Sequence, residues 1–283
     1  MTASPQSWPD LGKTAIGVAA LRAVESRRPD RLFDDFYARA FVEAGRALVP
    51  DLADAGQDDH RPLTGLGALF YAHVVVRTRF YDDYLLAATA SGCSQVVLLA
   101  AGLDTRAFRL CWPNPVRLFE LDLPAVLDFK QRVLANQGAT PSCARVAVPA
   151  DLREDWSGEL LAAGFQRAAP TAWLAEGLLV YLSYDEATRM LTTVNSLSAS
   201  GSHLSFEHSS RDDRAGLLAR ARAMPEASQL TSLWKGGLGE HAPQWLADHG
   251  WRSEIHSRRT LAARYGRPSD DPPSGGYLTA QRD

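Results

Sequence analysis

The stretch QVVLLAAGLDTRAFRL, residues 95–110, has the pattern of a buried strand that runs into a glycine turn and then a helix. An unbroken apolar run suits a strand covered on both faces, as in parallel sheets. Gly102 follows the strand directly, and glycine lets the backbone turn sharply and approach a ligand closely. A dinucleotide-binding turn has the pattern G-x-G-x-x-G, whereas the matching positions here are Ala100, Gly102 and Thr105. The turn therefore argues against a pyrophosphate ligand and a nicotinamide-dependent oxidoreductase.

Further short apolar runs follow this stretch, with helix-length segments between them. We expect strands at residues 95–100, 116–122, 144–150, 171–176 and 203–207, and two final strands at 251–257 and 276–283. Strands that alternate with helices indicate βαβ units and a mostly parallel sheet covered on both faces. The pattern predicts a doubly wound α/β domain.

The segments outside this alternation are mainly helical in pattern. We expect helices at 14–28, 32–42 and 67–90, a loop at 49–65 and a polar helix within 209–230. No repeat or long linker interrupts the sequence, which favours a single domain over residues 1–283. We divide it into a helical N-terminal cap (1–92), a ligand-binding core (93–208), a lid (209–239) and C-terminal helices and strands (240–283).

Composition and charge exclude several classes of function. The 283 residues include 30 Lys and Arg against 33 Asp and Glu, and no long basic run occurs, which argues against nucleic-acid binding. The sequence has no basic and apolar leader pattern and no apolar run of about 20 residues, so we expect a cytoplasmic protein without a membrane partner. The spacing of the three cysteines, Cys93, Cys111 and Cys143, suits neither a disulfide framework nor a zinc site, and we expect them to be reduced core or near-core residues. The seven histidines also lack metal-binding spacing, so we expect no metal.

Acidic residues lie at or just after the ends of four predicted strands, at Asp104, Asp122, Asp151 and Glu176. The carboxyl ends of parallel strands meet at one rim of the sheet, where such folds bind ligands. Asp122 lies about twenty residues after Gly102, where a carboxylate can accept both hydroxyls of a ribose. An acidic rim repels a diphosphate and favours a ligand that has an adenosine and a positive charge.

Each of these residues also has a structural interpretation. Gly102 can form a tight turn in any α/β protein, and Asp122, Asp151 and Glu176 can cap the helices that follow them. Arg77 can form an ion pair with Asp82 or Asp83 on its own helix. The joint placement of the acids on one rim favours ligand binding over capping.

Six segments together resemble one known family. They are VAALRAVESRRPDRLFDDFYARAFV, VVVRTRFYDDYLLAA, QVVLLAAGLDTRAFRL, ELDLPAVLDFK, VPADLREDW and TAWLAEGLLVYL. Their order and spacing resemble the bacterial branch of the leucine carboxyl methyltransferase family, whose members are S-adenosyl-L-methionine-dependent O-methyltransferases. The resemblance extends from about Thr14 to the C-terminus. It implies a class I methyltransferase fold, with a seven-stranded, mostly parallel sheet whose last strand is antiparallel, a helical N-terminal cap and a lid insertion after strand five.

The resemblance also implies which residues hold the adenosine part of S-adenosyl-L-methionine. Asp122 would bind the ribose hydroxyls, and Asp151 would accept from the adenine amino group. Leu152 would supply backbone and apolar contact.

The methionine part of the cofactor is assigned in the same way. Ala101 and Gly102 would form the turn beneath it, and Glu176 would lie near its amino group. Arg77 would pair with its carboxylate, with Arg79 as the competing candidate.

Two positions depart from the family pattern. Ala100 replaces the first glycine of the usual G-A-G turn, and Leu123 replaces the glutamine of the usual D-Q-P motif. Neither change removes a charged contact, so we expect cofactor binding to survive.

The sequence contains no convincing catalytic base, although Tyr181 and His208 are candidates because each lies just beyond or at the end of a predicted strand. A carboxylate is already ionised at pH 7 and needs no base, whereas an alcohol or an ordinary phenol benefits from one. The missing base favours a carboxylate or acidic hydroxyl as acceptor, and the family resemblance implies that the acceptor is a small molecule of secondary metabolism. A protein C-terminal carboxylate as acceptor, with residues 209–239 forming a wide mouth, and a non-catalytic cofactor-binding protein stay open as alternatives.

Overall fold

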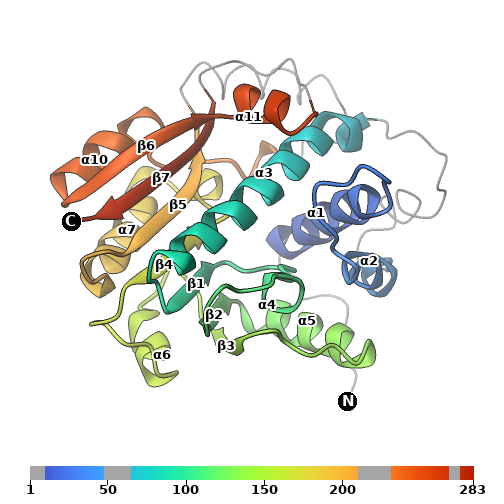
Figure 1. The fold of residues 1–283 in the computed structure, drawn as a ribbon, viewed down its shortest axis with the longest axis horizontal. Helices are drawn as coiled ribbons and strands as arrows, with labels where there is room; N and C mark the ends of the chain where they lie inside the picture. The colour runs from blue at the N-terminus through green and yellow to red at the C-terminus, as the bar shows by residue number, and fades with distance from the viewer. Residues whose placement is uncertain (1–9, 48–64, 210–230, 268–274) are drawn as a thin grey trace.

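The computed structural model describes residues 10–47, 65–209, 231–267 and 275–283, and their core is a single seven-stranded sheet (Figure 1). The strands are β1 (Gln95–Leu99), β2 (Arg117–Asp122), β3 (Ala144–Pro149), β4 (Thr171–Ala175), β5 (His203–His208), β6 (Trp251–Ser257) and β7 (Gly276–Arg282). Their order is β3-β2-β1-β4-β5-β7-β6. Strands β1 to β5 pair in parallel, and β7 runs antiparallel to both β5 and β6. The predicted α/β fold with an antiparallel last strand is confirmed.

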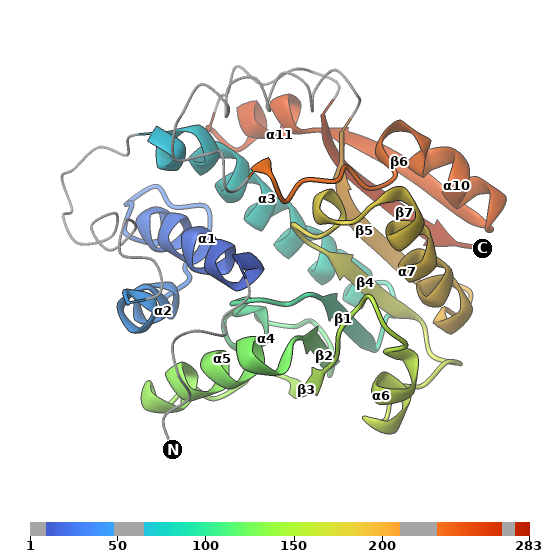
Figure 2. The ribbon, with the colours of Figure 1, turned by 180° about the vertical axis from the view of Figure 1, so that it is seen from behind.

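Helices cover both faces of the sheet (Figures 1 and 2). They are α1 (Asp10–Ser26), α2 (Ala38–Gly45), α3 (Gly65–Ala90), α4 (Arg106–Arg109), α5 (Pro124–Asn136), α6 (Ser157–Ala162), α7 (Tyr184–Leu197), α10 (Ala242–Asp248) and α11 (Arg258–Arg264), with 3₁₀ turns η3 (Leu179–Tyr181) and η5 (Gly239–His241). Successive strand residues point to opposite faces. Val96 and Leu98 pack on the side of α1, α2, α3, α5 and α11, whereas Val97 and Leu99 pack on the side of α6, α7 and α10. This two-sided burial explains the continuous apolar run in β1.

The second predicted helix, at 32–42, begins later than the apolar stripe indicates. Helix α2 starts at Ala38, because the backbone N–H groups of Leu32 and Asp35 donate to the side chains of Glu25 and Ser26 in the last turns of α1. These side-chain acceptors replace the helical carbonyls that the N–H groups would otherwise need. As a result Phe36, counted in the apolar stripe, is 58% exposed.

The helix after the glycine turn is also shorter than expected. Helix α4 has only four residues, Arg106–Arg109, with Thr105 as its N-cap residue. The carbonyls of Ala107 and Leu110 accept hydrogen bonds from Ser142, and the chain becomes extended at Leu110. A helix of four residues has only a small dipole, so Asp104 and Arg106 at its start act mainly through their own side chains.

Three smaller expectations have mixed outcomes. Cys93 is buried and Cys143 is partly buried, but Cys111 is exposed, so its prediction as a near-core residue is wrong. Residues 210–230 of the predicted lid and polar helix lie outside the described residues. In the described ranges no helix combines the length and apolar character that crossing a membrane requires.

Candidate functional site

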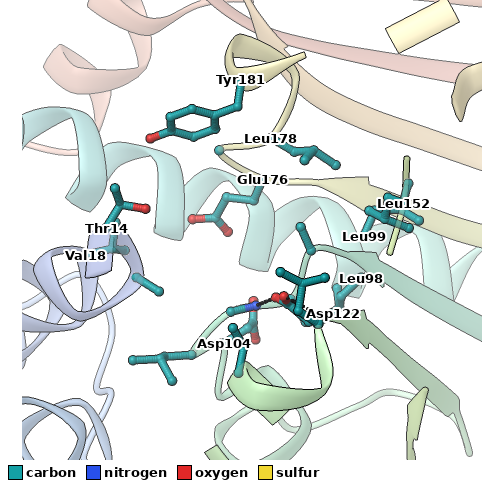
Figure 3. Close-up of a pocket in the computed structure, with 18 of the residues that line it drawn as sticks. Thr14, Val18, Leu98, Leu99, Asp104, Asp122, Leu152, Glu176, Leu178 and Tyr181 are labelled. Carbon is teal, nitrogen blue, oxygen red and sulfur yellow. Dashed lines mark hydrogen bonds between the residues drawn. The ribbon is translucent and has the colours of Figure 1, made fainter. Parts of the chain in front are cut away.

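A cavity of about 480 Å³ opens at the carboxyl ends of β1, β2, β3 and β4. Residues 100–104, 122–123, 150–153 and 176–178 line its sheet side, and α1 forms the opposite wall (Figure 3). Nine residues proposed from the sequence line this cavity: Arg77, Ala101, Gly102, Asp104, Asp122, Asp151, Leu152, Glu176 and Tyr181. Arg79 and His208 do not line it. The chain thus brings together residues from five separate segments at one rim.

The glycine turn and the end of β2 are joined through Asp122. The Gly102 N–H donates to Asp122 Oδ2 at 2.6 Å, and the Leu123 N–H donates to Oδ1 at 2.7 Å (Figure 3). Gly102 has a φ of 50° and Ala100 one of 53°, both in the left-handed region. Burial raises the pKa of Asp122, while the two backbone donors act against that rise. Asp122 therefore fixes the turn and does not cap α5, whose N-cap residue is Leu123.

Asp151 lies just after β3 at the edge of the cavity. Its carboxylate accepts from the Arg153 guanidinium, with a distance of 2.9 Å from Arg153 Nε to Asp151 Oδ1. The hydrogen bond from Arg153 holds the pKa of Asp151 below its ordinary value. Since the Arg153 side chain is 62% exposed, the pair stands at the open side of the cavity, next to Leu152.

Glu176, just after β4, binds three arginines at once. Its oxygens lie 2.7 Å from Arg22 Nη2, 2.9 Å from Arg77 Nε and 2.7 Å from Arg106 Nη1. Burial opposes ionisation of Glu176, but attraction to Arg106, Arg22 and Arg77 outweighs burial and lowers the pKa well below its usual range. The rim therefore contains the predicted acids, but arginines neutralise the charge of Glu176, Asp104 and Asp151.

Arg22 and Arg106 are partners of Glu176 that the sequence interpretation missed, and of the two Arg22 lines the cavity. Both are buried, and Arg106 also pairs with Asp82 and Asp104. A signal was present for Arg22, because it interrupts the apolar stretch AALRAV, whereas Arg106 follows the polar Asp104 and Thr105. A buried guanidinium requires a carboxylate partner, but a local pattern does not reveal which one.

The two candidates for the methionine carboxylate lie in different environments. Arg77 lines the cavity and pairs with Glu176 and Glu207, rather than with the aspartates on its own helix. Arg79 pairs with Asp83 and is 41% exposed. Only Arg77 of the two faces the cavity.

The far wall of the cavity is mainly apolar. Thr14 and Val18 of α1 face Tyr181 of η3, whose hydroxyl points toward Thr14 (Figure 3). Burial raises the pKa of Tyr181, so its phenol stays protonated at neutral pH. His208 is buried at the end of β5 and does not line the cavity.

Comparison with known proteins identifies the family. The sequence model of leucine carboxyl methyltransferase matches residues 15–195. The chain belongs to the leucine carboxyl methyltransferase family. A protein of Parafrankia sp. (strain EAN1pec), whose name assigns it to the S-adenosyl-L-methionine-dependent methyltransferases, is 50% identical over 96% of this chain and 87% of its own length. A protein of Streptomyces coelicolor with the same assignment is 44% identical over 95% of this chain and 94% of its own length.

Solved structures support the fold of this family member. A crystal structure named as a methyltransferase candidate from Thermobifida fusca has a TM-score of 0.53 at 16% identity, covering 93% of this chain and 94% of that one. Magnesium protoporphyrin IX methyltransferase from Synechocystis, crystallised with S-adenosylhomocysteine, has a TM-score of 0.51 at 12% identity, covering 85% and 94%. The protein is an S-adenosyl-L-methionine-dependent methyltransferase with the class I fold.

Proposed function

We propose that S-adenosyl-L-methionine binds in the cavity, with its adenosine between the ends of β2 and β3 and its methionine above the glycine turn. The residues present fit this ligand. Asp122 and Asp151 supply carboxylates from neighbouring strands for the ribose hydroxyls and the adenine amino group, with Leu152 beside the base. The cavity volume lies within the roughly 300–1,000 Å³ typical of small-molecule sites.

The methionine part would meet charged groups near the end of β4 and on α3. Arg77 would pair with the carboxylate, and Glu176 would lie near the amino group. Ala101 and Gly102 would leave room for the backbone to approach the ligand. Bound S-adenosyl-L-methionine supplies a methyl group activated by a positively charged sulfur.

We further propose that the acceptor is a carboxylate or an acidic hydroxyl of a small molecule. Within the described ranges, the cavity lining contains no histidine, and each of its carboxylates already accepts from an arginine or a backbone N–H. This observation carries the proposal, because a site without a free base suits an acceptor that arrives ionised. The neutral Tyr181 hydroxyl would donate a hydrogen bond to the acceptor oxygen, and the apolar wall would exclude water. The family resemblance favours a cytoplasmic role in secondary metabolism.

Calorimetric titration with S-adenosylhomocysteine tests the cofactor site. We expect micromolar binding to the wild type and at least a roughly 10-fold loss in Asp122→Ala, because the variant loses a charged acceptor for the ribose. Asp128→Ala, an exposed acid on the neighbouring helix α5, is the matched control and should bind normally. Equal affinity of all three proteins would contradict the role of Asp122.

A panel of aromatic and aliphatic carboxylic acids and phenols, assayed with methyl-labelled cofactor, tests the acceptor class. For a carboxylate acceptor, kcat should stay constant between about pH 6 and 9, because neither the acceptor nor a base titrates there. For an acidic hydroxyl it should rise only up to the pKa of the acceptor. Cofactor binding without turnover of any small molecule would favour the non-catalytic alternative, and turnover only of a peptide C-terminus would favour the protein acceptor.

A further inference from the structure

The carboxylate of Glu207 contacts both the turn after β4 and Arg77 on α3, although Glu207 does not line the cavity. It lies near the end of β5, and its side chain is 26% exposed. Its oxygens accept from the Gly177 N–H at 2.8 and 2.9 Å and from Arg77 Nη1 at 3.1 Å. One carboxylate thus holds both the turn after β4 and the arginine on α3.

The contacts of Arg77 define how its guanidinium is oriented. Nε donates to Glu176 and Nη1 donates to Glu207, so two edges of the planar group are fixed by carboxylates at the ends of neighbouring strands. In the described part of the chain, Nη2 has no such acceptor, and Arg77 lines the cavity. Among the described residues, the geometry leaves the two N–H groups of Nη2 for a ligand. Because the five guanidinium N–H groups have fixed directions in one plane, holding Nε and Nη1 also sets the directions of the Nη2 pair.

The turn after β4 is part of the same arrangement. Gly177 has a φ of 64°, and a Cβ built there would lie 3.4 Å from Arg77 Nη1. The guanidinium therefore packs directly against this turn. Because Gly177 follows Glu176 in the chain, any shift of the turn moves Glu176 as well.

We propose that Glu207 is a positioning residue of the cofactor site, which orients Arg77 toward the carboxylate of the bound methionine by holding both Arg77 and the Gly177 turn. The inference rests on the proposed role of Arg77 in the cofactor site. Glu207 acts only through these two groups, since it does not line the cavity itself. It should therefore influence only the amino-acid end of the ligand.

Two ligands distinguish this role from a general structural one. S-adenosylhomocysteine has the amino-acid carboxylate, whereas 5′-methylthioadenosine retains the adenosine and sulfur but lacks that carboxylate. In Glu207→Gln the side chain keeps one acceptor oxygen but loses the charge that attracts Arg77. We expect calorimetry to show a roughly 10-fold weaker affinity for S-adenosylhomocysteine. The affinity for 5′-methylthioadenosine should change less than about twofold, which also reports that the variant is folded.

Three further proteins complete the experiment. Arg77→Ala should show the same selective loss. The double variant Arg77→Ala/Glu207→Gln should bind no more weakly than Arg77→Ala alone, since the glutamine keeps an acceptor oxygen for the Gly177 N–H and loses only the attraction to Arg77. Glu254→Gln, which removes a 76% exposed carboxylate from β6, should bind both ligands normally.

Several outcomes would overturn the proposal. Equal loss of both ligands in Glu207→Gln would show that the residue supports the whole pocket, and unchanged S-adenosylhomocysteine affinity would show that Arg77 does not depend on it. Additive losses in the double variant would separate the two residues. A wild type that binds neither ligand would refute the cofactor site itself, whereas failure of only the selectivity would leave that site intact.

Discussion

Ala100 occupies a backbone conformation that favours glycine. Its φ of 53° is the only positive value for a non-glycine residue in the described ranges, at the position where the family pattern has glycine. The left-handed conformation costs an alanine about 1–2 kcal/mol. Glycine would remove this strain but would gain freedom in the unfolded chain, which offsets part of the benefit. The departure noted from the sequence thus has a local energetic cost.

We predict that Ala100→Gly raises the free energy of unfolding by about 0.5–1 kcal/mol. Chemical denaturation of the cofactor-free protein measures this change. Ala87→Gly, at an exposed position within α3, should lower the same free energy by about 1 kcal/mol, since glycine is unfavourable in a helix. A loss of stability in both variants would mean that Ala100 is not strained.

The acids of the cavity rim could be predicted from the sequence, because their positions follow from local patterns. Asp122, Asp151 and Glu176 were placed at the rim because each follows an apolar strand run, and all three line the cavity. The sequence did not reveal the partners of Glu176, because Arg22 lies 154 positions away and Arg106 lies 70 positions away. Ion pairs between distant segments depend on the folded arrangement of α1, α4 and β4 rather than on any short pattern.

The connections between elements converge on the turn after β4. Glu176 links α1, α3 and α4 to this turn through Arg22, Arg77 and Arg106. The turn is also held from the other side, where the N–H groups of Lys235 and Gly236 donate to the Val180 carbonyl in η3. The described end of the predicted lid is therefore attached to the same loop that contributes Tyr181.

Element boundaries were predictable where side chains alone decide them. All seven strands were predicted to within one residue at each end. In β1, β2 and β4 the reason is an apolar run bounded by turn residues, whereas β6 (WRSEIHS) has no such run. The predicted start of α2 was wrong, since Glu25 and Ser26 accept hydrogen bonds that compete with the helical ones, and Ser142 likewise bonds to carbonyls near the early end of α4. Tertiary hydrogen bonds of this kind are not visible in the periodicity.

Because Glu176 joins α1, α3 and α4 through its negative charge, the free energy of unfolding should depend on the pH. Its pKa in the folded protein is well below the ordinary 4.5, so ionised Glu176 stabilises the fold fully above about pH 4.5. As the pH falls further, the unfolded chain binds a proton that the folded chain does not, and the stabilisation decreases. We predict that the difference in unfolding free energy between wild type and Glu176→Gln is about 3–5 kcal/mol at pH 7.

Lowering the pH from 4.5 to 3.5 should reduce that difference by about 1 kcal/mol. Denaturant unfolding of the two cofactor-free proteins at a series of pH values provides the measurement. Glu254→Gln, an exposed acid on β6, should show a small difference at every pH. A wild-type-to-variant difference that grows as the pH falls would show that Glu176 is not held ionised by the arginines.

In the whole molecule, the cavity lies between the sheet and the N-terminal helix α1. The sheet rim forms one wall, whereas α1 forms the other through Thr14, Ala15, Val18 and Arg22 (Figure 3). Ala15 is close to the glycine turn, since its Cβ lies 3.5 Å from a Cβ built on Gly102. A cofactor bound here would contact the N-terminal helix and the sheet simultaneously and would hold them together.

Binding should therefore stabilise α1 more than distant parts of the fold. At a ligand concentration 100 times Kd, binding adds about 2.7 kcal/mol to the unfolding free energy. We predict that S-adenosylhomocysteine slows hydrogen exchange of backbone amides in α1 and in residues 100–104, while β6 at the far sheet edge changes little. Exchange measured by mass spectrometry with and without ligand tests this, and Asp122→Ala at the same ligand concentration should show little protection. Protection confined to the strand ends, with α1 unchanged, would mean that the N-terminal helix is not a wall of the occupied site. The cofactor would then be held by the rim of the sheet alone, without contact to Thr14 and Val18 of α1.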